Sequence, residues 1–527
     1  MKKKQFLCLI TACALLSGCA QIEQEELSPE TVLTATGTTA LQSESAADST
    51  IPKRETVALQ VPEITRQDAK INIEAEDAAI PEQCAVAVMP RLGYSGTGYL
   101  SGLNAENKVK LSLQAEIPAT QHYDITFVVG SVAPSTCKIL ANDEPVYTLQ
   151  TEPTDNFVRI TVQGVFLNSG SCTFSIEPVE GSIDVDCLEL TNNESLYEES
   201  AAVADAPVDP SASAGAKKLY KYLKDAYGSK IATGQYVSDN TGKEIGEIYS
   251  ITGEYPMIRF ADLGAYSPNG GDQTKATAIA DSLAWAEEGG VVGLSWYWNA
   301  PTGTPSVYAK DTTFDLAKAV TEEDVASLSL EALQKKQQAG EISEECCALI
   351  QDIDALSADM QPLADADVPV LWRPLMEASG EWYWWGASGA DAYRWLWNLM
   401  YTRMTSYHNL HNLIWVWNGQ SNAFQVDADK YDIAALDLYV EKEEVYGSRY
   451  EQYVALRNMV PGKMLAISEC SNIPDITAMF RDNAVWSFFG LWYAPYLGEY
   501  TDNQALVDFY HSEGTLTRND YAAALQG

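Results

Sequence analysis

Residues 369–385 read PVLWRPLMEASGEWYWW, an apolar run, Pro369–Ala378, with a carboxylate, Glu377, at its end. It is one of eight apolar runs that alternate with amphipathic segments. The predicted strands are Lys230–Val237, Pro256–Leu263, Gly289–Trp298, Pro369–Ala378, Asn412–Gly419, Tyr431–Tyr439, Lys463–Cys470 and Ala484–Tyr493. The predicted helices include Ala276–Glu288, Glu344–Ala364, Ala390–His408 and Ser448–Val460. Eight such units predict an α/β fold, a (β/α)8 TIM barrel over residues 216–527.

Two carboxylates lie at the ends of predicted strands. Glu377 ends the fourth strand and Glu469 the seventh, within Leu465–Cys470. The catalytic groups of such barrels come from the C-terminal ends of the strands, and strands four and seven face each other across the mouth. Cleavage of a glycosidic bond needs one proton donor and one nucleophile, roughly 5 Å apart when the anomeric configuration is retained. The sequence therefore indicates glycoside hydrolysis.

Four consecutive aromatic residues, Trp382–Trp385, follow the first of these carboxylates. A loop of this composition would expose large apolar rings to water. Sugars offer a reason for such rings, because their C–H faces stack on them while neighbouring polar groups bind the hydroxyls. We therefore expect a sugar-binding cleft beside Glu377.

The composition excludes other classes of function. The 34 Lys+Arg and 73 Asp+Glu residues give a net charge of −39, which leaves no basic surplus to bind nucleic acid. The four histidines are scattered, so neither a His-rich metal site nor a His-based triad is expected. All 13 tryptophans lie between Trp285 and Trp492, inside the predicted barrel.

The N-terminus predicts export. Three lysines precede the apolar run Phe6–Leu16, which is typical of a secretory signal and too short for a permanent membrane span. Leu16–Cys19 resembles a bacterial lipobox, which implies acylation of Cys19, a signal peptide over residues 1–19 and a lipid-anchored protein at the cell surface. An ordinary signal peptide with a chance cysteine is the alternative. Residues 20–69 are predicted to form an acidic, Ser/Thr-rich tether.

Residues 70–192 predict an all-β sandwich with a jelly-roll arrangement, because short β-branched runs alternate with Gly, Pro, Asn and Asp. A linker, residues 193–215, follows. The sandwich resembles carbohydrate-binding modules of families 6 and 35, on the segments Ile73–Ala78, Gly93–Tyr99 and Ile183–Asp186. That resemblance implies a structural calcium held by Glu74, Glu76 and Asp186; a solvated acidic edge is the alternative. Sugar binding by this module and the pairing of Cys84, Cys137, Cys172 and Cys187 stay open.

The barrel resembles glycoside hydrolase family 26 of clan A, whose best-known activity is endo-β-1,4-mannanase. The matching segments are Gly234–Tyr236, Phe260–Asp262, Gly293–Trp296, Trp298–Pro301, Trp372–Trp385, Trp415–Asn418, Asp437–Tyr439 and Ser468–Glu469. By this resemblance Glu377 is the general acid/base and Glu469 is the nucleophile. The substrate-binding residues it implies are Trp382, Tyr439, Trp492, Tyr297, Trp298, Asn299 and Asp262, with Tyr439 bonded to the nucleophile. Asp262 and Asn299 have structural capping as an equal alternative.

Two positions depart from the family pattern. Met376 and Tyr297 stand where the family usually has histidines beside the sugar that is attacked. The two-carboxylate mechanism survives this change, whereas the set of sugar hydroxyls that the site can bind is altered. We expect a monomeric, retaining endo-β-1,4-mannanase that needs no cofactor for catalysis. We expect it to contact the membrane only through the lipid on Cys19. The alternatives are a hydrolase of another β-linked polysaccharide, such as β-glucan or β-1,3-xylan, and a non-catalytic glycan-binding lipoprotein.

Overall fold

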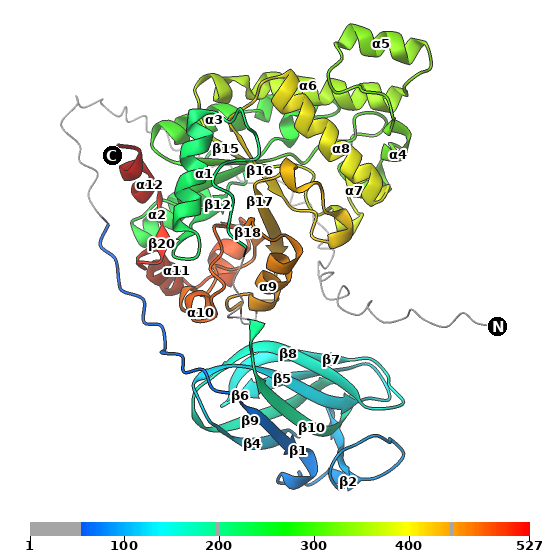
Figure 1. Cartoon of the computed structure of the whole chain (residues 1–527), viewed down its shortest axis with the longest axis vertical. Coiled ribbons are helices and arrows are strands. Elements are labelled where there is room, and N and C mark those ends of the chain that lie inside the picture. The colour runs from blue at the N-terminus through cyan, green and yellow to red at the C-terminus, as the bar shows by residue number, and fades with distance from the viewer. Residues whose placement is uncertain (1–53, 196–200, 443–445, 527) are drawn as a thin grey trace, which may run out of the picture.

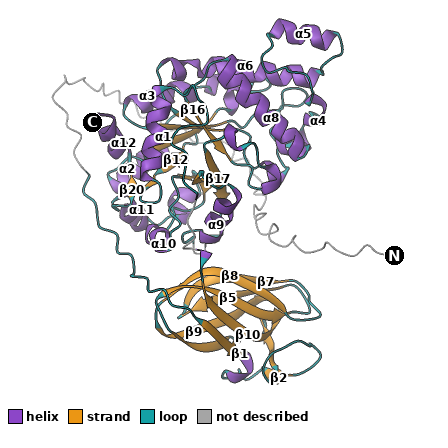
Figure 2. Ribbon diagram, in the orientation of Figure 1, coloured by secondary structure: helices purple, strands orange, loops and turns teal. Residues whose placement is uncertain are grey.

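The computed structural model describes residues 54–195, 201–442 and 446–526 (Figure 1). The predicted signal peptide, Cys19 and most of the predicted tether lie outside the described residues, as does part of the predicted linker. Within the described part of the chain, no helix has both the length and the apolar character needed to cross a membrane. The described residues form an antiparallel β-sandwich followed by a closed parallel barrel (Figures 1 and 2).

The sandwich consists of two antiparallel sheets. One sheet has the order β2-β3-β10-β5-β8, with β1 also paired to β10, and the other has the order β4-β9-β6-β7. The strands are β1 (Lys70–Glu74), β2 (Ala85–Ala87), β3 (Tyr99–Asn104), β4 (Leu111–Ile117), β5 (Gln121–Gly130), β6 (Ser135–Ala141), β7 (Glu144–Thr151), β8 (Val158–Leu167), β9 (Gly170–Glu180) and β10 (Ser182–Asn192). Alternate side chains of β4 are buried, as expected of a strand with one face on a core. The predicted sandwich is confirmed.

The barrel closes through eight parallel strands in sequence order. They are β12 (Gly234–Tyr236), β13 (Ile258–Asp262), β14 (Val291–Ser295), β15 (Val370–Arg373), β16 (Leu413–Trp417), β17 (Ile433–Leu438), β18 (Met464–Cys470) and β19 (Phe489–Leu491). Pairing of Gln235 with Leu491 closes the ring. A short parallel pair, β11 (Ile231–Ala232) with β20 (Thr515–Leu516), adjoins it. The predicted (β/α)8 fold is confirmed.

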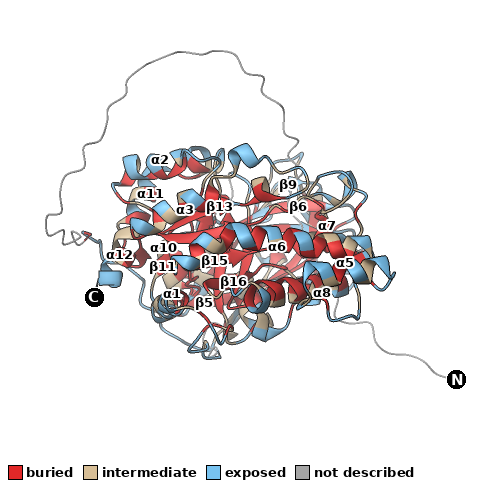
Figure 3. Cartoon of the chain, turned by 90° about the horizontal axis from the view of Figure 1, so that it is seen from above, coloured by how far each residue is buried: buried red, intermediate tan, exposed pale blue. Residues whose placement is uncertain are grey.

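Helices surround the barrel strands (Figure 2). They are α1 (Ala214–Ala226), α2 (Lys243–Thr252), α3 (Ala278–Glu287), α4 (Leu316–Ala319), α5 (Leu330–Gln338), α6 (Glu344–Asp365), α7 (Trp384–Ala387), α8 (Ala390–Thr402), α9 (Tyr450–Met459), α10 (Ile476–Arg481), α11 (Asn503–Tyr510) and α12 (Arg518–Gln526). In the longer helices α1, α6 and α8, one face is buried and the other is exposed (Figure 3). This one-sided burial explains the three-and-four spacing in the sequence.

All eight predicted barrel strands exist, but each is shorter than predicted. The fourth ends at Arg373 rather than Ala378, because Pro374 follows and Leu375 and Glu377 both adopt a left-handed backbone, with φ of +51°. A non-glycine residue in this region costs roughly 1–2 kcal/mol. The extended run therefore stops, and Glu377 belongs to the loop after β15.

The sandwich is joined to the barrel by buried polar contacts. His122 on β5 bonds Asp482 of the barrel, with 2.8 Å between Nε2 and Oδ1, and the Tyr450 hydroxyl of α9 donates to Asn193 at 3.2 Å. The segment before the sandwich also packs on the barrel: the Arg54 guanidinium is buried and donates to the carbonyl of Thr515 at 2.6 Å. The predicted tether over residues 20–69 therefore includes a stretch that is bonded to the barrel rather than solvated.

Candidate active site

Glu469 lies near the C-terminal end of β18 and is only 4% exposed. Its Oε2 accepts a hydrogen bond from the Tyr439 hydroxyl at 2.8 Å, which is the contact expected for Tyr439. Its Oε1 accepts a hydrogen bond from Nη2 of Arg373, on β15. Two donors, one of them cationic, therefore hold the two oxygens of this carboxyl group in place.

Glu377 lies in the loop after β15 and is 8% exposed. Its backbone N–H donates to the carbonyl of Asn418 at 2.8 Å, which fixes the left-handed turn. Its Oε1 accepts a hydrogen bond from Nε2 of Gln420 at 3.3 Å. Burial, reinforced by the negative charges of Asp437 and Glu469, raises the pKa of Glu377 well above its usual value.

Arg373 holds the acidic groups of the site together. Its Nη1 donates to Asp437 Oδ2 at 2.9 Å and to Asn418 Oδ1 at 3.1 Å, while Nη2 bonds Glu469. The side chain of Asp437 is fully buried, and this burial raises its pKa to about 7 against the opposing effect of Arg373. A single cation therefore serves two buried carboxyl groups, and the adjacent Glu377 has no such direct partner among the described basic side chains.

This arrangement gives the two glutamates opposite roles in proton chemistry. Burial and the neighbouring negative charges favour a proton on Glu377, whereas Glu469 accepts hydrogen bonds from Arg373 and Tyr439. An acid and a carboxylate nucleophile at one barrel mouth are what double-displacement glycoside hydrolysis requires.

Aromatic rings lie beside the two glutamates. Trp382 is half-buried, and its ring covers Gly380, where a Cβ atom would approach the ring to 2.0 Å. Trp492 is also half-buried and contacts Tyr236, at 4.6 Å between ring centroids, and Tyr297, at 6.5 Å. Trp382, Trp492 and Tyr297 are therefore accessible rings at the predicted cleft.

The prediction that Trp298 binds substrate is wrong, because its side chain is fully buried and cannot stack on a sugar. Its ring is stacked on Trp296, with 4.1 Å between centroids, and its Nε1 donates to Asp352 at 2.8 Å. Trp384 and Trp385 are buried as well, and their indole N–H groups donate to the carbonyls of Trp298 and Met376. Most of the aromatic run 382–385 is thus core, contrary to the expectation that a ligand covers it.

Met376 and two polar candidates also have structural positions. The Met376 side chain is fully buried, so it offers nothing to a ligand at the place where the family histidine would stand. Asp262 accepts from the backbone N–H groups of Tyr297 at 2.7 Å and Gly264 at 2.8 Å. Asn299 donates from Nδ2 to the carbonyl of Asn269 at 3.1 Å. These hydrogen bonds support the alternative interpretation, in which Asp262 and Asn299 have a structural role in their loops.

Comparison with known proteins identifies the scaffold. The family model of glycosyl hydrolase family 26 matches residues 208–520. This chain belongs to glycosyl hydrolase family 26. A curated relative from Thermothelomyces thermophilus, named mannan endo-1,4-beta-mannosidase, is 31% identical over 469 residues, 85% of this chain and 89% of that protein. A second, mannan endo-1,4-beta-mannosidase A of Piromyces sp, is 30% identical over 467 residues, 85% of this chain and 70% of that protein.

Solved structures agree with the family 26 assignment. A Podospora anserina enzyme described as a GH26-CBM35 beta-(1,4)-mannanase has 30% identity and a TM-score of 0.59, over 86% of this chain and 99% of that chain. A beta-mannanase from a symbiotic protist of the termite Reticulitermes speratus has 27% identity and a TM-score of 0.54, over 61% of this chain and 99% of that chain. The chain is therefore a glycoside hydrolase of family 26.

Sequence reasoning assigned no role to several residues that build the site of this family 26 hydrolase. These are Arg373, Asn418, Gln420, Asp437 and Ser468. Each lies at or just after the C-terminal end of a barrel strand, and Ser468 Oγ donates to Asp437 at 2.6 Å. A signal was present, because a charged residue inside an apolar strand, such as Arg373 after Trp372, is rarely buried without a partner.

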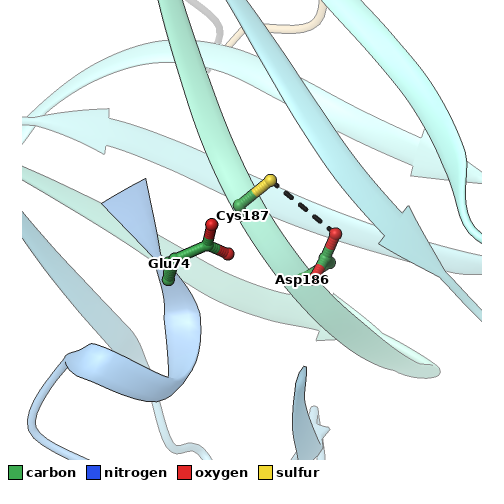
Figure 4. A group of neighbouring side chains, drawn as sticks. All are labelled: Glu74, Asp186 and Cys187. Carbon is green, nitrogen blue, oxygen red and sulfur yellow. Dashed lines mark hydrogen bonds between the residues drawn. The ribbon is translucent and has the colours of Figure 1, made fainter. Parts of the chain in front are cut away.

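The sandwich of the family 26 chain carries a second acidic group. Ligand atoms of Glu74, Asp186 and Cys187 lie within 4.8 Å of one another (Figure 4), while Glu76 falls outside this group. Glu76 instead accepts the Thr97 N–H at 2.6 Å on the same turn where Ser95 donates its N–H to Asp186 at 2.9 Å. The sandwich cysteines Cys84, Cys137, Cys172 and Cys187 are free thiols.

Proposed function

We propose that this chain is a retaining endo-β-1,4-mannanase. The observation that carries the proposal is the placement of Glu377 and Glu469 at one barrel mouth, with Arg373 bonded to Glu469 and burial favouring a proton on Glu377. The substrate follows from relatives named mannan endo-1,4-beta-mannosidase that share most of this chain. The substrate class, a polysaccharide, is common to these relatives.

In the first step, Glu469 attacks the anomeric carbon while Glu377 protonates the leaving glycosidic oxygen. The anomeric C–O bond to the leaving sugar breaks, and a C–O bond to Glu469 forms. Tyr439 and Arg373 bind the two oxygens of the nucleophile. The carboxyl group of Glu469 is therefore already oriented for attack and does not have to rotate. The product is a covalent glycosyl-enzyme and a shortened chain.

In the second step, Glu377 is a carboxylate and accepts a proton from water, which attacks the anomeric carbon from the face the leaving group vacated. The bond to Glu469 breaks and both glutamates return to their starting protonation states. No cofactor takes part in either step. Two inversions retain the anomeric configuration.

Sugar positioning falls to the accessible rings Trp382, Trp492 and Tyr297, with Asp262 and Asn299 as additional hydroxyl contacts through their remaining lone pairs. Tyr297 lies between Trp492 and Tyr383, at 6.5 and 5.9 Å between centroids. A phenol at this position binds hydroxyls differently from an imidazole, so Tyr297 is the residue most able to change the preferred sugar.

Reducing-sugar release from mannan, glucomannan, lichenan and β-1,3-xylan tests the proposal. We expect release from mannan and glucomannan, with none from xylan. Release from lichenan or xylan alone would replace mannan by another β-linked polysaccharide. Binding to a polysaccharide without any release would mean a glycan-binding lipoprotein instead of an enzyme.

The product profile on linear mannan tests the endo mode. Early products of mixed length are expected, since an endo-acting enzyme cleaves internal bonds of the chain. A single small product from the first minutes onward would mean exo action. Proton NMR of the first-formed anomer, taken before mutarotation, distinguishes retention from inversion.

We also propose that the protein is a monomeric lipoprotein anchored to the cell surface through acylated Cys19. The support is the sequence Leu16–Cys19 after an apolar signal. Metabolic labelling with an alkyne fatty acid, comparing the native chain with Cys19→Ala, tests the anchor, and light scattering of a form that begins after Cys19 tests the monomer. Labelling that persists in Cys19→Ala would contradict the site.

The sandwich is proposed to be a carbohydrate-binding module with a structural calcium. Its support is the similarity to a GH26-CBM35 structure over 86% of this chain and the carboxylates of Glu74 and Asp186, which lie in one group with Cys187. Glu76, the third expected ligand, lies outside that group. Burial raises the pKa of Cys187 to about 12, so its thiol stays protonated and oxygen atoms are the available ligands, which suits calcium better than zinc. Affinity electrophoresis in mannan tests sugar binding.

A further inference from the structure

Gln420 follows β16 and is half-buried beside both Glu377 and Asp437. Its backbone is left-handed, with φ of +58°, a conformation that non-glycine residues adopt when surrounding contacts enforce it. Its side-chain Oε1 accepts the backbone N–H of Asp437 at 3.1 Å. The amide therefore spans from the strand that carries Asp437 to the acid/base carboxyl group.

The contact with Asp437 fixes the orientation of the Gln420 amide. A backbone N–H can only donate, so the atom of Gln420 that faces it is the oxygen, and the atom that faces Glu377 is the NH2 nitrogen. Nε2 lies 3.3 Å from Oε1 of Glu377. Because an N–H group points at Oε1, that oxygen is held as an acceptor, and a proton is disfavoured on Oε1 relative to Oε2.

We propose that Gln420 is a positioning residue that selects which oxygen of Glu377 carries the transferable proton. With Oε1 held as an acceptor, the proton resides on Oε2, the oxygen left for the leaving group. In the first step the Oε2–H bond breaks, the proton joins the leaving oxygen, and the N–H of Gln420 stabilises the carboxylate that remains. This role rests on the proposed two-glutamate mechanism.

Several charged and titratable groups act on Glu377 from the neighbouring elements. Asp437 on β17 and Glu469 on β18 favour the protonated form, while Arg373 on β15 and a hydrogen bond with Trp382 favour the ionised form. The phenols of Tyr297 and Tyr383 are close enough to interact with Glu377, and both are held neutral. Gln420 adds a neutral donor on the ionised side of this balance.

Gln420→Met tests the proposal, since it keeps the length of the side chain and removes the donor. We expect kcat on manno-oligosaccharides to fall about 10-fold or more, because protonation becomes misdirected. We expect the basic limb of kcat/KM to move to higher pH, because the carboxylate has lost a donor. An aryl mannoside whose leaving group needs no protonation should lose far less in the glycosylation step.

Gln425→Met is the matched control. Gln425 lies on the same connection, and its Nε2 donates to the Tyr431 hydroxyl at 3.3 Å, away from the glutamates. Its kinetics and pH profile should match those of the native protein. Circular dichroism and thermal unfolding of both variants check that each is folded.

Gln420→Glu gives a second, independent readout. It keeps the acceptor for the Asp437 N–H, and at neutral pH it replaces the donor by a carboxylate. Its activity should be lower than that of the native protein at pH 7 and should recover as the pH falls and the new carboxyl group gains a proton to donate. A native pH profile in Gln420→Met or Gln420→Glu, with native activity on oligosaccharides, overturns this role. If the native protein itself hydrolyses no polysaccharide, the proposed function fails instead.

Discussion

Two clusters of carboxylates lie in this chain, one at the barrel mouth and one in the sandwich. At the barrel mouth, Arg373 is placed between Asp437 and Glu469. In the sandwich, Asp186 and its neighbouring glutamates accept hydrogen bonds from neutral groups of the turn around Ser95. Burial and the nearby acidic groups raise the pKa of Asp186. The carboxylates at the barrel mouth therefore bond a buried cation. Among the described residues, those around Asp186 in the sandwich are bonded by neutral donors.

The difference teaches what each cluster can do. The internal cation is bonded to Asp437 and Glu469, whereas burial and the nearby acidic groups favour a proton on Glu377. A cluster without a cation relieves its repulsion by taking up protons or a metal ion. Catalysis fits the first cluster and ion-dependent stability fits the second. Four experiments separate them.

The largest effect is expected from Glu377→Ala and Glu469→Ala. Each should lower turnover of mannan by at least about a thousandfold, because one loses the proton donor and the other the nucleophile. Steady-state reducing-sugar assays measure this, with thermal unfolding as the test of folding. Glu381→Gln, an exposed acid on the same loop, is the control and should keep native turnover. Near-native turnover in either glutamate variant would rule out the assignment.

Removal of the internal cation should destabilise the fold and abolish activity. Arg373→Met leaves Asp437 and Glu469 buried without their counter-charge, which should lower the free energy of unfolding by about 3–5 kcal/mol and abolish activity. Urea unfolding measures the change. Arg66→Met, at an exposed ion pair with Glu194, should change stability by less than about 1 kcal/mol. Equal stability losses in both variants would contradict the distinction.

The pH dependence of stability tests the raised pKa of Glu377. Above the usual glutamate pKa of about 4.3 the unfolded chain loses this proton while the folded chain keeps it, so the free energy of unfolding falls as pH rises towards the folded pKa. Each unit of pKa difference corresponds to about 1.4 kcal/mol. Glu377→Gln should therefore unfold at a higher temperature than the native protein at pH 7 and at a similar temperature near pH 4. Identical melting curves at both pH values would contradict a raised pKa.

The smallest effect is expected in the sandwich. Millimolar calcium should raise the melting temperature by a few degrees relative to EGTA, since an ion that binds only the folded state stabilises it by mass action. Asp186→Asn should lose this response and keep native activity on soluble oligosaccharides. Calorimetry with and without EGTA provides the measurement. A calcium effect on kcat that Asp186→Asn leaves intact would place the ion elsewhere.

Much of the fold followed from the sequence. The eight apolar runs predicted the barrel because strands that are buried on both faces must be continuously apolar. The strand-end rule then placed Glu377 and Glu469 at one edge, as the structure has them. The aromatic run 382–385 misled, because composition does not distinguish a ring packed in the core from a ring that lines a cleft. The prediction that Trp298 binds substrate was wrong for the same reason.

Sequence by itself determined the architecture and the two glutamates, because periodicity and strand order are local properties of the chain. Only the tertiary structure decided their chemistry. The chemistry depends on contacts between residues far apart in sequence. Arg373 on β15 bonds Asp437 on β17 and Glu469 on β18, and Gln420 bonds Glu377. A pKa depends on what surrounds a group in space, and that surrounding exists only once the barrel has closed.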